Sequence, residues 1–242
     1  MMESSLFLNP MRSAGNLDTF WSRRAILNAL TEQLTNFHGT CLDVGCGRMP
    51  YKSLILAAPG KVKRYIGMDL RADLGHPAYA QLNEPDLDWD GRTIPLDTST
   101  VDCTLATEVF QYFQNVELVM REVIRVLKPS GLFFFTLPFL WPLHDAPIDQ
   151  FRYTPFALKR LLEQAGFCQI QMKAMGGWDA SLAQMIGLWV RRRPMNGQIR
   201  RIASILALPV VRCLQKTDKP QPVFTDQQMI TGISGTARKP AA

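Results

Sequence analysis

The sequence CLDVGCGRMP, residues 41–50, constrains the fold more than any other stretch of this chain. A short apolar run leads to Asp43 and is followed by two glycines, Gly45 and Gly47, and Pro50 then opens a segment with helical periodicity. A glycine loop between a strand and a helix lets backbone N–H groups approach a ligand at the carboxyl edge of a parallel sheet. The stretch therefore predicts a strand, a nucleotide-type loop and a helix.

The rest of the chain continues as an alternation of strand and helix patterns. Strands are expected at 40–44, 62–70, 87–90, 101–107, 132–138, 167–175 and 229–239, and helices at 17–36, 51–58, 115–128 and 154–166. The run LFFFTLP at 132–138 is apolar apart from Thr136, which is typical of a strand covered on both faces. Strands that alternate with helices predict an α/β fold with a doubly wound, mostly parallel sheet and helices on both faces.

Two of the helices carry recognisable end signals. The first is expected to begin at an N-cap provided by Asp18 or Thr19. The helix at 154–166 is expected to begin with Thr154 as N-cap and Pro155 at its first position, and to stop at Gly166.

The pattern changes between residues 179 and 228. Two apolar and basic helical stretches, 179–192 and 197–215, are separated by Pro194 and Gly197. We treat 179–228 as a helical insertion before the last strand. The chain is then divided into an N-terminal helical segment (1–38), a core (39–178), the insertion (179–228) and the last strand with its tail (229–242).

An acidic residue narrows the class of ligand that the loop can bind. Asp69 ends the second strand 22 residues after Gly47, about the offset at which a carboxylate reaches a ribose diol. The dinucleotide fingerprint G-x-G-x-x-G needs a third glycine where this chain has Pro50. The loop and the acid together predict a cofactor that contains ribose, and they disfavour NAD.

Composition excludes several other classes of protein. The five cysteines are an odd number without a C-x-x-C pair, which argues against a disulfide framework and against a zinc site, and we expect no metal. The N-terminus has no secretory pattern, and the longest apolar runs are shorter than a membrane span. We expect a cytoplasmic protein that is at most peripheral to the inner face of a membrane.

Several motifs in the same order resemble a known family. LDVGCG with GMD, then IPLDTSTVDCTLATEVFQYF and VMREVIRVLKPSGLFFFTLP, are similar to class I S-adenosylmethionine-dependent methyltransferases of the type-11 branch. The resemblance covers roughly residues 40–175 and the final strand. It implies a Rossmann-like fold, S-adenosyl-L-methionine as cofactor and methyl transfer as activity. The chain departs from the family at Met49, where many relatives have glycine, and at Tyr112, where they have histidine.

The resemblance also implies which residues bind the cofactor. It assigns Asp43, Gly45 and Gly47 to the methionine part, Asp69 with the adjoining Leu70 to the ribose, Trp89 and Asp90 to the adenine, and Thr107 and Glu108 to the floor of the site. A structural role stays open for single members of this set. Asp43 could bond loop amides, Asp69 could be an ordinary strand-end residue, and Glu108 could be a surface acid.

A second polar cluster follows the fifth predicted strand, within PFLWPLHDAPIDQFRYTP (138–155). We expect this loop to cap the substrate, with His144 as a base because imidazole is the side chain whose unperturbed charge change falls near neutral pH. Asp145 or Asp149 would orient it. The HDAPxDxxRYT run also resembles a loop of bacterial type-11 methyltransferases that are associated with cell-surface glycans or lipids.

Substrate contacts are expected from Arg152 and Tyr153 in this loop and from Tyr112. A structural alternative stays open, in which Asp149 pairs with Arg152, Tyr153 packs, and the loop is an ordered lid.

The methyl acceptor is an unidentified partner, either a small molecule or a glycan or lipid precursor. An RNA methyltransferase, an NAD-dependent oxidoreductase and a catalytically idle S-adenosylmethionine-binding domain are the alternatives. No stable nucleic acid partner is expected, because the chain has no RNA-binding module and only a local basic patch. The apolar helices of 179–215, with their arginine flanks, suit peripheral contact with a membrane, a cover over the substrate or a homo-oligomer interface.

Overall fold

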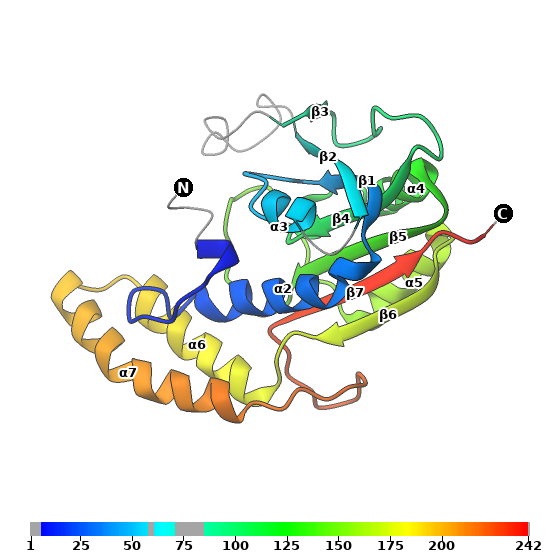
Figure 1. Ribbon diagram of the computed structural model, residues 1–242. Helices are drawn as coiled ribbons and strands as arrows, with labels where there is room; N and C mark the ends of the chain where they lie inside the picture. The colour runs from blue at the N-terminus through cyan, green and yellow to red at the C-terminus, as the bar shows by residue number, and fades with distance from the viewer. Residues whose placement is uncertain (1–5, 58–60, 71–84, 242) are drawn as a thin grey trace.

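The computed structural model describes residues 6–57, 61–70 and 85–241 (Figure 1). Its centre is a seven-stranded sheet with the strand order β3-β2-β1-β4-β5-β7-β6. The strands are β1 (His38–Val44), β2 (Lys61–Leu70), β3 (Leu87–Trp89), β4 (Val101–Thr107), β5 (Leu127–Pro138), β6 (Cys168–Ala174) and β7 (Gly232–Arg238). Only β7 runs antiparallel to its neighbours, β5 and β6. The predicted α/β fold with a mostly parallel sheet is confirmed.

Helices cover both faces of this sheet (Figure 1). They are α2 (Phe20–Gln33), α3 (Lys52–Ala57), α4 (Val116–Val126), α5 (Pro155–Ala165), α6 (Trp178–Arg192) and α7 (Gly197–Thr217), with short 3₁₀ turns η1 (Leu34–Asn36) and η2 (Phe110–Tyr112). One apolar core joins α2 and α3 to the sheet, and a second core joins α4 and α5 to its other face. Among the described helices, none is long and apolar enough to cross a bilayer.

The central strand β5 contributes to both cores. Phe133 and Phe135 pack in the core under α4 and α5, while Phe134 points to the other face and contacts Phe37 edge to face. Alternate side chains of a strand point to opposite faces, so a strand buried on both sides is apolar at most of its positions. This explains the continuous apolar run that the sequence shows.

The end signals of α5 work as predicted. The Thr154 hydroxyl accepts a hydrogen bond from the Ala157 N–H at 3.2 Å, and Pro155 is the first helical residue. Gly166 ends the helix with φ of 98°, a left-handed conformation that glycine adopts without steric cost.

The helix predicted over 115–128 ends earlier than expected. It begins after Asn115, whose side chain accepts a hydrogen bond from the Leu118 N–H, and stops at Val126. Leu127 instead opens β5 and pairs with Val101 of β4. The apolar periodicity continued through Leu127 because this side chain is buried, but the burial comes from a strand.

The start of α2 also differs from the prediction. Thr19 occupies the N-cap position, but its side chain makes no capping hydrogen bond. The Asp18 carboxylate is used elsewhere, because it accepts a hydrogen bond from the Arg192 Nε at 2.7 Å. Asp18 therefore ties the start of α2 to the end of α6.

The helices α6 and α7 form a hairpin between β6 and β7. Its base is fixed by Asp218, whose carboxylate accepts hydrogen bonds from the N–H groups of Gly177 and Ala180 and so caps α6. The Thr217 hydroxyl donates to Asp179 at 2.7 Å. The hairpin is therefore held at its base by these contacts and near its far end by the ion pair with Asp18.

Candidate active site

The glycine loop that follows β1 is hydrogen-bonded to the end of β2. The Gly45 N–H donates to the Met68 carbonyl at 2.8 Å, and a side chain at Gly45, where φ is 72°, would collide with Val109. The Gly47 N–H donates to Asp69 Oδ2 at 2.5 Å, and the space beside the Gly47 Cα is open. The predicted loop and the predicted ribose acid are therefore in direct contact.

Asp69 holds the loop and still has acceptor capacity. Its Oδ2 accepts from Gly47, and its Oδ1 accepts from the Leu70 N–H at 2.7 Å. Each carboxylate oxygen has two lone pairs, so each can accept a further hydrogen bond from a diol. Burial raises the pKa of Asp69, and the two N–H groups oppose that rise.

Asp43 is buried at the end of β1. Its Oδ2 accepts a hydrogen bond from the Tyr65 hydroxyl, while its Oδ1 has no partner among the described residues. Burial raises the pKa of Asp43 to about 7, the Tyr65 hydroxyl opposes this rise, and the charge of Asp69 adds to it. A buried carboxyl group with a raised pKa favours a positively charged neighbour, since a nearby cation stabilises its ionised form.

The structure does not place the side chains of Trp89 and Asp90 at the loop. The Trp89 indole is only 1% exposed and packs edge to face on Phe113, with ring centroids 5.5 Å apart. Asp90 is exposed and closes a turn by accepting from the N–H groups of Arg92 and Thr93, each at 2.8 Å. Contact of either residue with adenine stays a prediction.

Thr107 and Glu108 follow β4 at the same edge of the sheet. Thr107 pairs with Thr136 of β5, and the Glu108 N–H donates to the Thr136 carbonyl at 2.9 Å. Glu108 has a φ of 54°, which is uncommon for a residue with a side chain. Burial raises the pKa of its carboxyl group to about 7, against the opposing effects of the Thr136 hydroxyl and the Arg152 charge. Its Oε1 has no hydrogen-bond partner within the described part of the chain.

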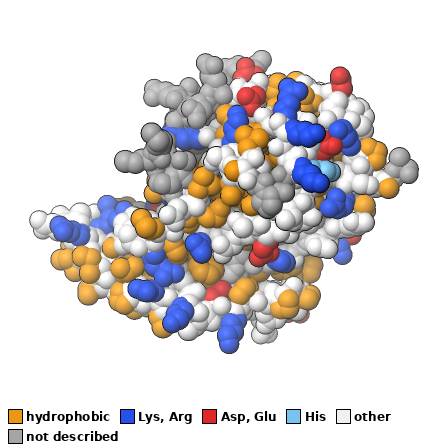
Figure 2. Space-filling model, in the orientation of Figure 1, with side chains coloured by type: hydrophobic (Ala, Val, Ile, Leu, Met, Phe, Trp, Pro, Cys, Tyr) orange, Lys and Arg blue, Asp and Glu red, His pale blue; other side chains and the backbone are white. Residues whose placement is uncertain are grey.

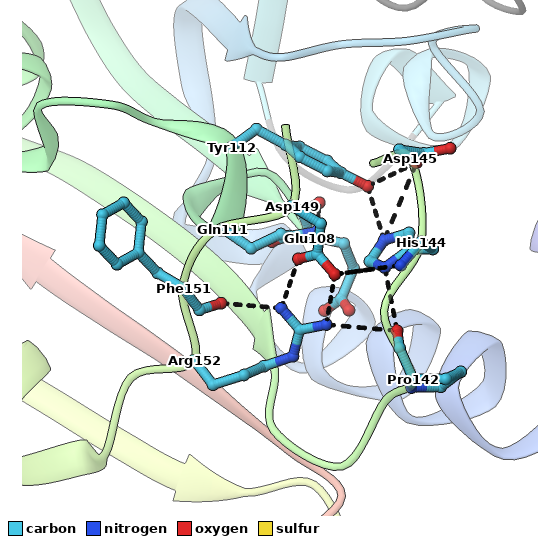
Figure 3. Close-up of polar contacts among 9 residues, drawn as sticks. All are labelled: Glu108, Gln111, Tyr112, Pro142, His144, Asp145, Asp149, Phe151 and Arg152. Atoms are coloured by element: carbon cyan, nitrogen blue, oxygen red, sulfur yellow. Dashed lines mark hydrogen bonds and ion pairs between the residues drawn. The ribbon is translucent and has the colours of Figure 1, made fainter. Parts of the chain in front are cut away.

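Glu108 lies beside the second cluster of polar residues (Figure 3). In this cluster His144 Nδ1 is 3.0 Å from Asp149 Oδ2 and 3.2 Å from the Pro142 carbonyl oxygen. Both are acceptors, so the partners assign a proton to Nδ1. The other ring nitrogen, Nε2, is 2.7 Å from the Tyr112 hydroxyl.

Asp149 is the anchor of the cluster. Its side chain is 1% exposed and is paired with Arg152 through two contacts, at 2.5 and 2.9 Å. Burial raises the pKa of Asp149, but the Arg152 hydrogen bonds and the contacts with His144 outweigh it, so the pKa lies below its usual range. The carboxylate is therefore charged when it holds the imidazole.

The two aspartates predicted to orient His144 have separate contacts. Asp149 meets Nδ1, whereas Asp145 Oδ2 accepts from the Tyr112 hydroxyl at 2.9 Å and is 3.9 Å from Nε2. The geometry thus favours Asp149 as the orienting group. The pair of Asp149 with Arg152, expected under the structural alternative, is also present.

Tyr153 and Gln111 complete the surroundings of the cluster. Burial raises the pKa of Tyr153 to about 12, and its hydroxyl has no hydrogen-bond partner among the residues described. Gln111 was not predicted from sequence. The Gln111 Nε2 donates to the backbone carbonyl of Glu108 at 2.7 Å, and the backbone carbonyl of Gln111 accepts from the Gln150 N–H. Gln111 therefore links the end of β4 to the loop. The sequence signal for it is a polar residue between the apolar and aromatic residues of VFQYF, and the structure buries it.

His38 is exposed at the start of β1, and His76 lies outside the described residues. Within the described ranges, no three His, Cys, Asp or Glu side chains gather in an arrangement that could hold a metal ion.

Part of this chain is similar to a known protein family. Residues 42–135 match the family model described as "Methyltransferase domain". A "Sterol 4-C-methyltransferase" of Caenorhabditis elegans is 31% identical over 97 residues, 38% of this chain and 29% of that protein. Two proteins of Mycolicibacterium smegmatis also match. One is named "Probable S-adenosylmethionine-dependent methyltransferase" (28% identical, 52% of this chain and 51% of that protein), and the other "Fatty-acid O-methyltransferase" (30%, 39% and 35%).

Solved structures agree with the fold. A methyltransferase from Mesorhizobium loti has a TM-score of 0.54 at 18% identity and covers 89% of this chain and 98% of its own. One from Thermotoga maritima has a TM-score of 0.55 at 10% identity, with 89% of each chain covered. The chain spans about half the length, or less, of the curated relatives it matches. It is related to class I S-adenosylmethionine-dependent methyltransferases in sequence and in fold.

Proposed function

We propose that this protein transfers a methyl group from S-adenosyl-L-methionine to an acceptor that must lose a proton. The observation that carries the proposal is the contact of Asp69 with the Gly47 N–H. It joins a glycine loop to a carboxylate at the carboxyl edge of a parallel sheet, where ligands bind in folds of this class. The match of residues 42–135 to the methyltransferase domain supports the choice of cofactor.

The residues of the loop fit this cofactor. The open acceptor sites of Asp69 suit the two ribose hydroxyls, and the open space beside Gly47 leaves room for a close approach. The unpartnered Oδ1 of buried Asp43 suits a ligand that carries positive charge, as the ammonium and sulfonium groups of S-adenosylmethionine do. When bound, this cofactor supplies a methyl group that its sulfonium already activates.

The protein then has to align the acceptor and remove its proton. We assign the removal of the acceptor's proton to His144. Asp149 holds the Nδ1 proton, which leaves the Nε2 lone pair directed at the Tyr112 hydroxyl. The Tyr112 hydroxyl has one proton, which would turn from Asp145 Oδ2 to Nε2 in this step. The proton of the acceptor hydroxyl would pass to the Tyr112 oxygen as the Tyr112 proton moves to Nε2, so that the imidazolium formed is paired with Asp149. Such general-base assistance contributes roughly 100-fold or more to a rate.

The loop also indicates the kind of acceptor. Leu143, beside His144, is 86% exposed, and Phe151, beside Arg152, is 39% exposed, so the loop presents apolar side chains to solvent next to its polar cluster. Two relatives are named for a sterol and for a fatty acid. We therefore propose an acceptor with an apolar body and a hydroxyl group, either a small lipid or a lipid-linked glycan precursor.

Calorimetric titration with S-adenosylmethionine tests the cofactor assignment. Asp69→Asn should weaken binding about tenfold or more, since a hydrogen bond to a charged group is worth about 1.5–3 kcal/mol. Asp97→Asn, at an exposed position before β4, is the matched control and should bind normally. A 2′-deoxy analogue should bind the wild type more weakly than the parent cofactor does, and Asp69→Asn should not distinguish the two.

Labelled S-adenosylmethionine incubated with fractionated cell extract tests the acceptor. Label should enter the lipid or glycolipid fraction. Entry of label into RNA would support the alternative of an RNA methyltransferase, and NAD binding in place of S-adenosylmethionine would support an oxidoreductase. Tight cofactor binding with no labelled product in any fraction would support an idle binding domain.

A further inference from the structure

The net positive charge of this chain is concentrated in one helical hairpin. The hairpin of α6 and α7, residues 178–217, holds seven of the 27 Lys and Arg residues and one of the 21 Asp and Glu residues. This difference equals the formal net charge of +6 for the whole chain, so the remainder is balanced. The single acidic residue, Asp179, is occupied by the Thr217 hydroxyl.

The same hairpin exposes apolar side chains. On α6, Trp178, Leu182, Met185 and Trp189 follow one another at helical spacing and are 64, 52, 49 and 52% exposed. Residues spaced four, three and four apart lie on one face of a helix. The other positions around this row, such as Ala183, are buried against the body or α7.

On α7 the exposed apolar residues also share one face. Ile199, Ile202, Ile205, Leu206 and Val210 are between 50 and 68% exposed. At about 100° per residue they span an arc of roughly 140°. The buried residues of α7, namely Ser204, Val211 and Gln215, lie on the opposite side of the helix. The apolar face of α7 is therefore directed away from the protein.

Cationic side chains lie among and beside these rows. Figure 2 shows Lys and Arg side chains interspersed with hydrophobic ones over the lobe that α6 and α7 form. The Arg193 guanidinium lies over the Trp189 ring at 4.3 Å, and Arg201 and Arg212 are exposed on α7. An apolar stripe with basic flanks is the pattern of helices that lie in the interface of an anionic bilayer.

We propose that the outer face of the α6–α7 hairpin docks on an anionic lipid membrane. The net charge of the hairpin favours an anionic membrane over a second copy of the chain, because two hairpins that each carry a formal charge of +6 would repel one another. It also decides against an uncharged apolar partner, which would leave the arginines without counter-charges. Exposed tryptophan, leucine and isoleucine supply the apolar contact that nucleic acid does not need.

The hairpin is connected to the candidate active site. The Arg192 guanidinium lies 5.7 Å from the Trp141 ring, and that ring is 6.4 Å from His144. The neighbouring Leu143 is the most exposed large apolar residue of the described chain, at 86%. Docking of the hairpin would therefore bring the loop that carries His144 close to the lipid surface.

Vesicle co-sedimentation of the full chain tests the proposal without any methyl acceptor, so its result is independent of the methyl-transfer assay. The protein should bind vesicles of phosphatidylcholine mixed with phosphatidylglycerol, bind pure phosphatidylcholine much less, and be released by salt. The exposed substitutions Leu206→Glu and Arg201→Glu with Arg212→Glu should each reduce partition about tenfold or more. Phe156→Glu and Arg160→Glu on exposed positions of α5 are the matched controls and should have no effect.

Absence of binding to the anionic vesicles overturns the proposal, as does equal loss of binding in the α5 controls. So does a dimer in analytical ultracentrifugation that Leu206→Glu dissociates while vesicle binding is absent. Retention by an RNA oligonucleotide of matched charge, without vesicle binding, would overturn it in favour of nucleic acid. Circular dichroism melts of each variant establish that the fold is kept.

Discussion

Asp149 and His144 meet within the loop that follows β5, with Asp149 Oδ2 3.0 Å from His144 Nδ1. Arg152 neutralises the same carboxylate through two further contacts. A buried, charged carboxylate on one ring nitrogen fixes the tautomer and the orientation of the imidazole, which leaves the other nitrogen free to take a proton. The loop thus positions an imidazole beside the edge of the sheet at which the glycine loop lies.

Asp149→Asn should slow methyl transfer about 100-fold. An amide can donate to Nδ1, which would place the imidazole proton on Nε2 and remove the basic nitrogen from the Tyr112 side. The affinity for S-adenosylmethionine should not change, because Asp149 does not contact the glycine loop. Steady-state rates and calorimetry on the same preparation check both points. Asp145→Asn is the comparison and should cost less than tenfold; an unchanged rate in Asp149→Asn would remove Asp149 from the mechanism.

Tyr112→Phe should lower the rate about tenfold and change its pH profile. The phenylalanine ring keeps the packing, but His144 Nε2 loses the hydroxyl at 2.7 Å and must take the proton directly. The measurement is kcat and kcat/KM against pH for both proteins. Loss of activity without any change in the profile would indicate that Tyr112 only packs against the acceptor.

The stability of the ligand-free protein should fall as pH rises from about 4 to about 7. Burial raises the pKa values of Asp43 and Glu108 from 3.8 and 4.5 to about 7, so the folded state binds more protons than the unfolded state over this range. Stability is then fully present below the unfolded pKa values and is lost through the folded ones. Asp149, with a lowered pKa, acts oppositely and only at lower pH.

Thermal melts across this pH range check the sign. Asp43→Asn and Glu108→Gln, which cannot ionise, should each flatten the dependence. A Tm that rises steadily over the same range in the wild type would contradict the assignment.

Met49→Gly should tighten binding of S-adenosylmethionine or leave it unchanged. Met49 has a φ of 50°, a left-handed conformation that costs a residue with a side chain about 1–2 kcal/mol. The relief of this backbone strain is offset by lost packing, since the Met49 sulfur packs against Gly67, in the space that a side chain at Gly67 would occupy. We therefore expect a small change in Tm. Marked weakening in calorimetry would mean that Met49 forms part of the pocket.

Local patterns predicted the parts of this site that depend on chain direction. The strand before Gly45 and the acid at Asp69 follow from spacing, because parallel strands end at one edge of a sheet. The sequence could not place Tyr112 against His144, since 32 residues separate them and their contact depends on the path of the loop. The left-handed backbone of Glu108 and the use of Asp18 by Arg192 also come from tertiary contacts. Local sequence propensity does not predict such long-range contacts.

Asp218→Ala should loosen the base of the hairpin and not the sheet. The carboxylate accepts from the Gly177 and Ala180 N–H groups, and removal of such a cap costs about 1–2 kcal/mol. Hydrogen exchange should therefore speed up for amides in the first turn of α6, while those of β4 and β5 keep their protection. Asp226→Ala, at an exposed position of the loop after α7, is the control. Faster exchange throughout the sheet would show instead that the hairpin and the core unfold as one unit.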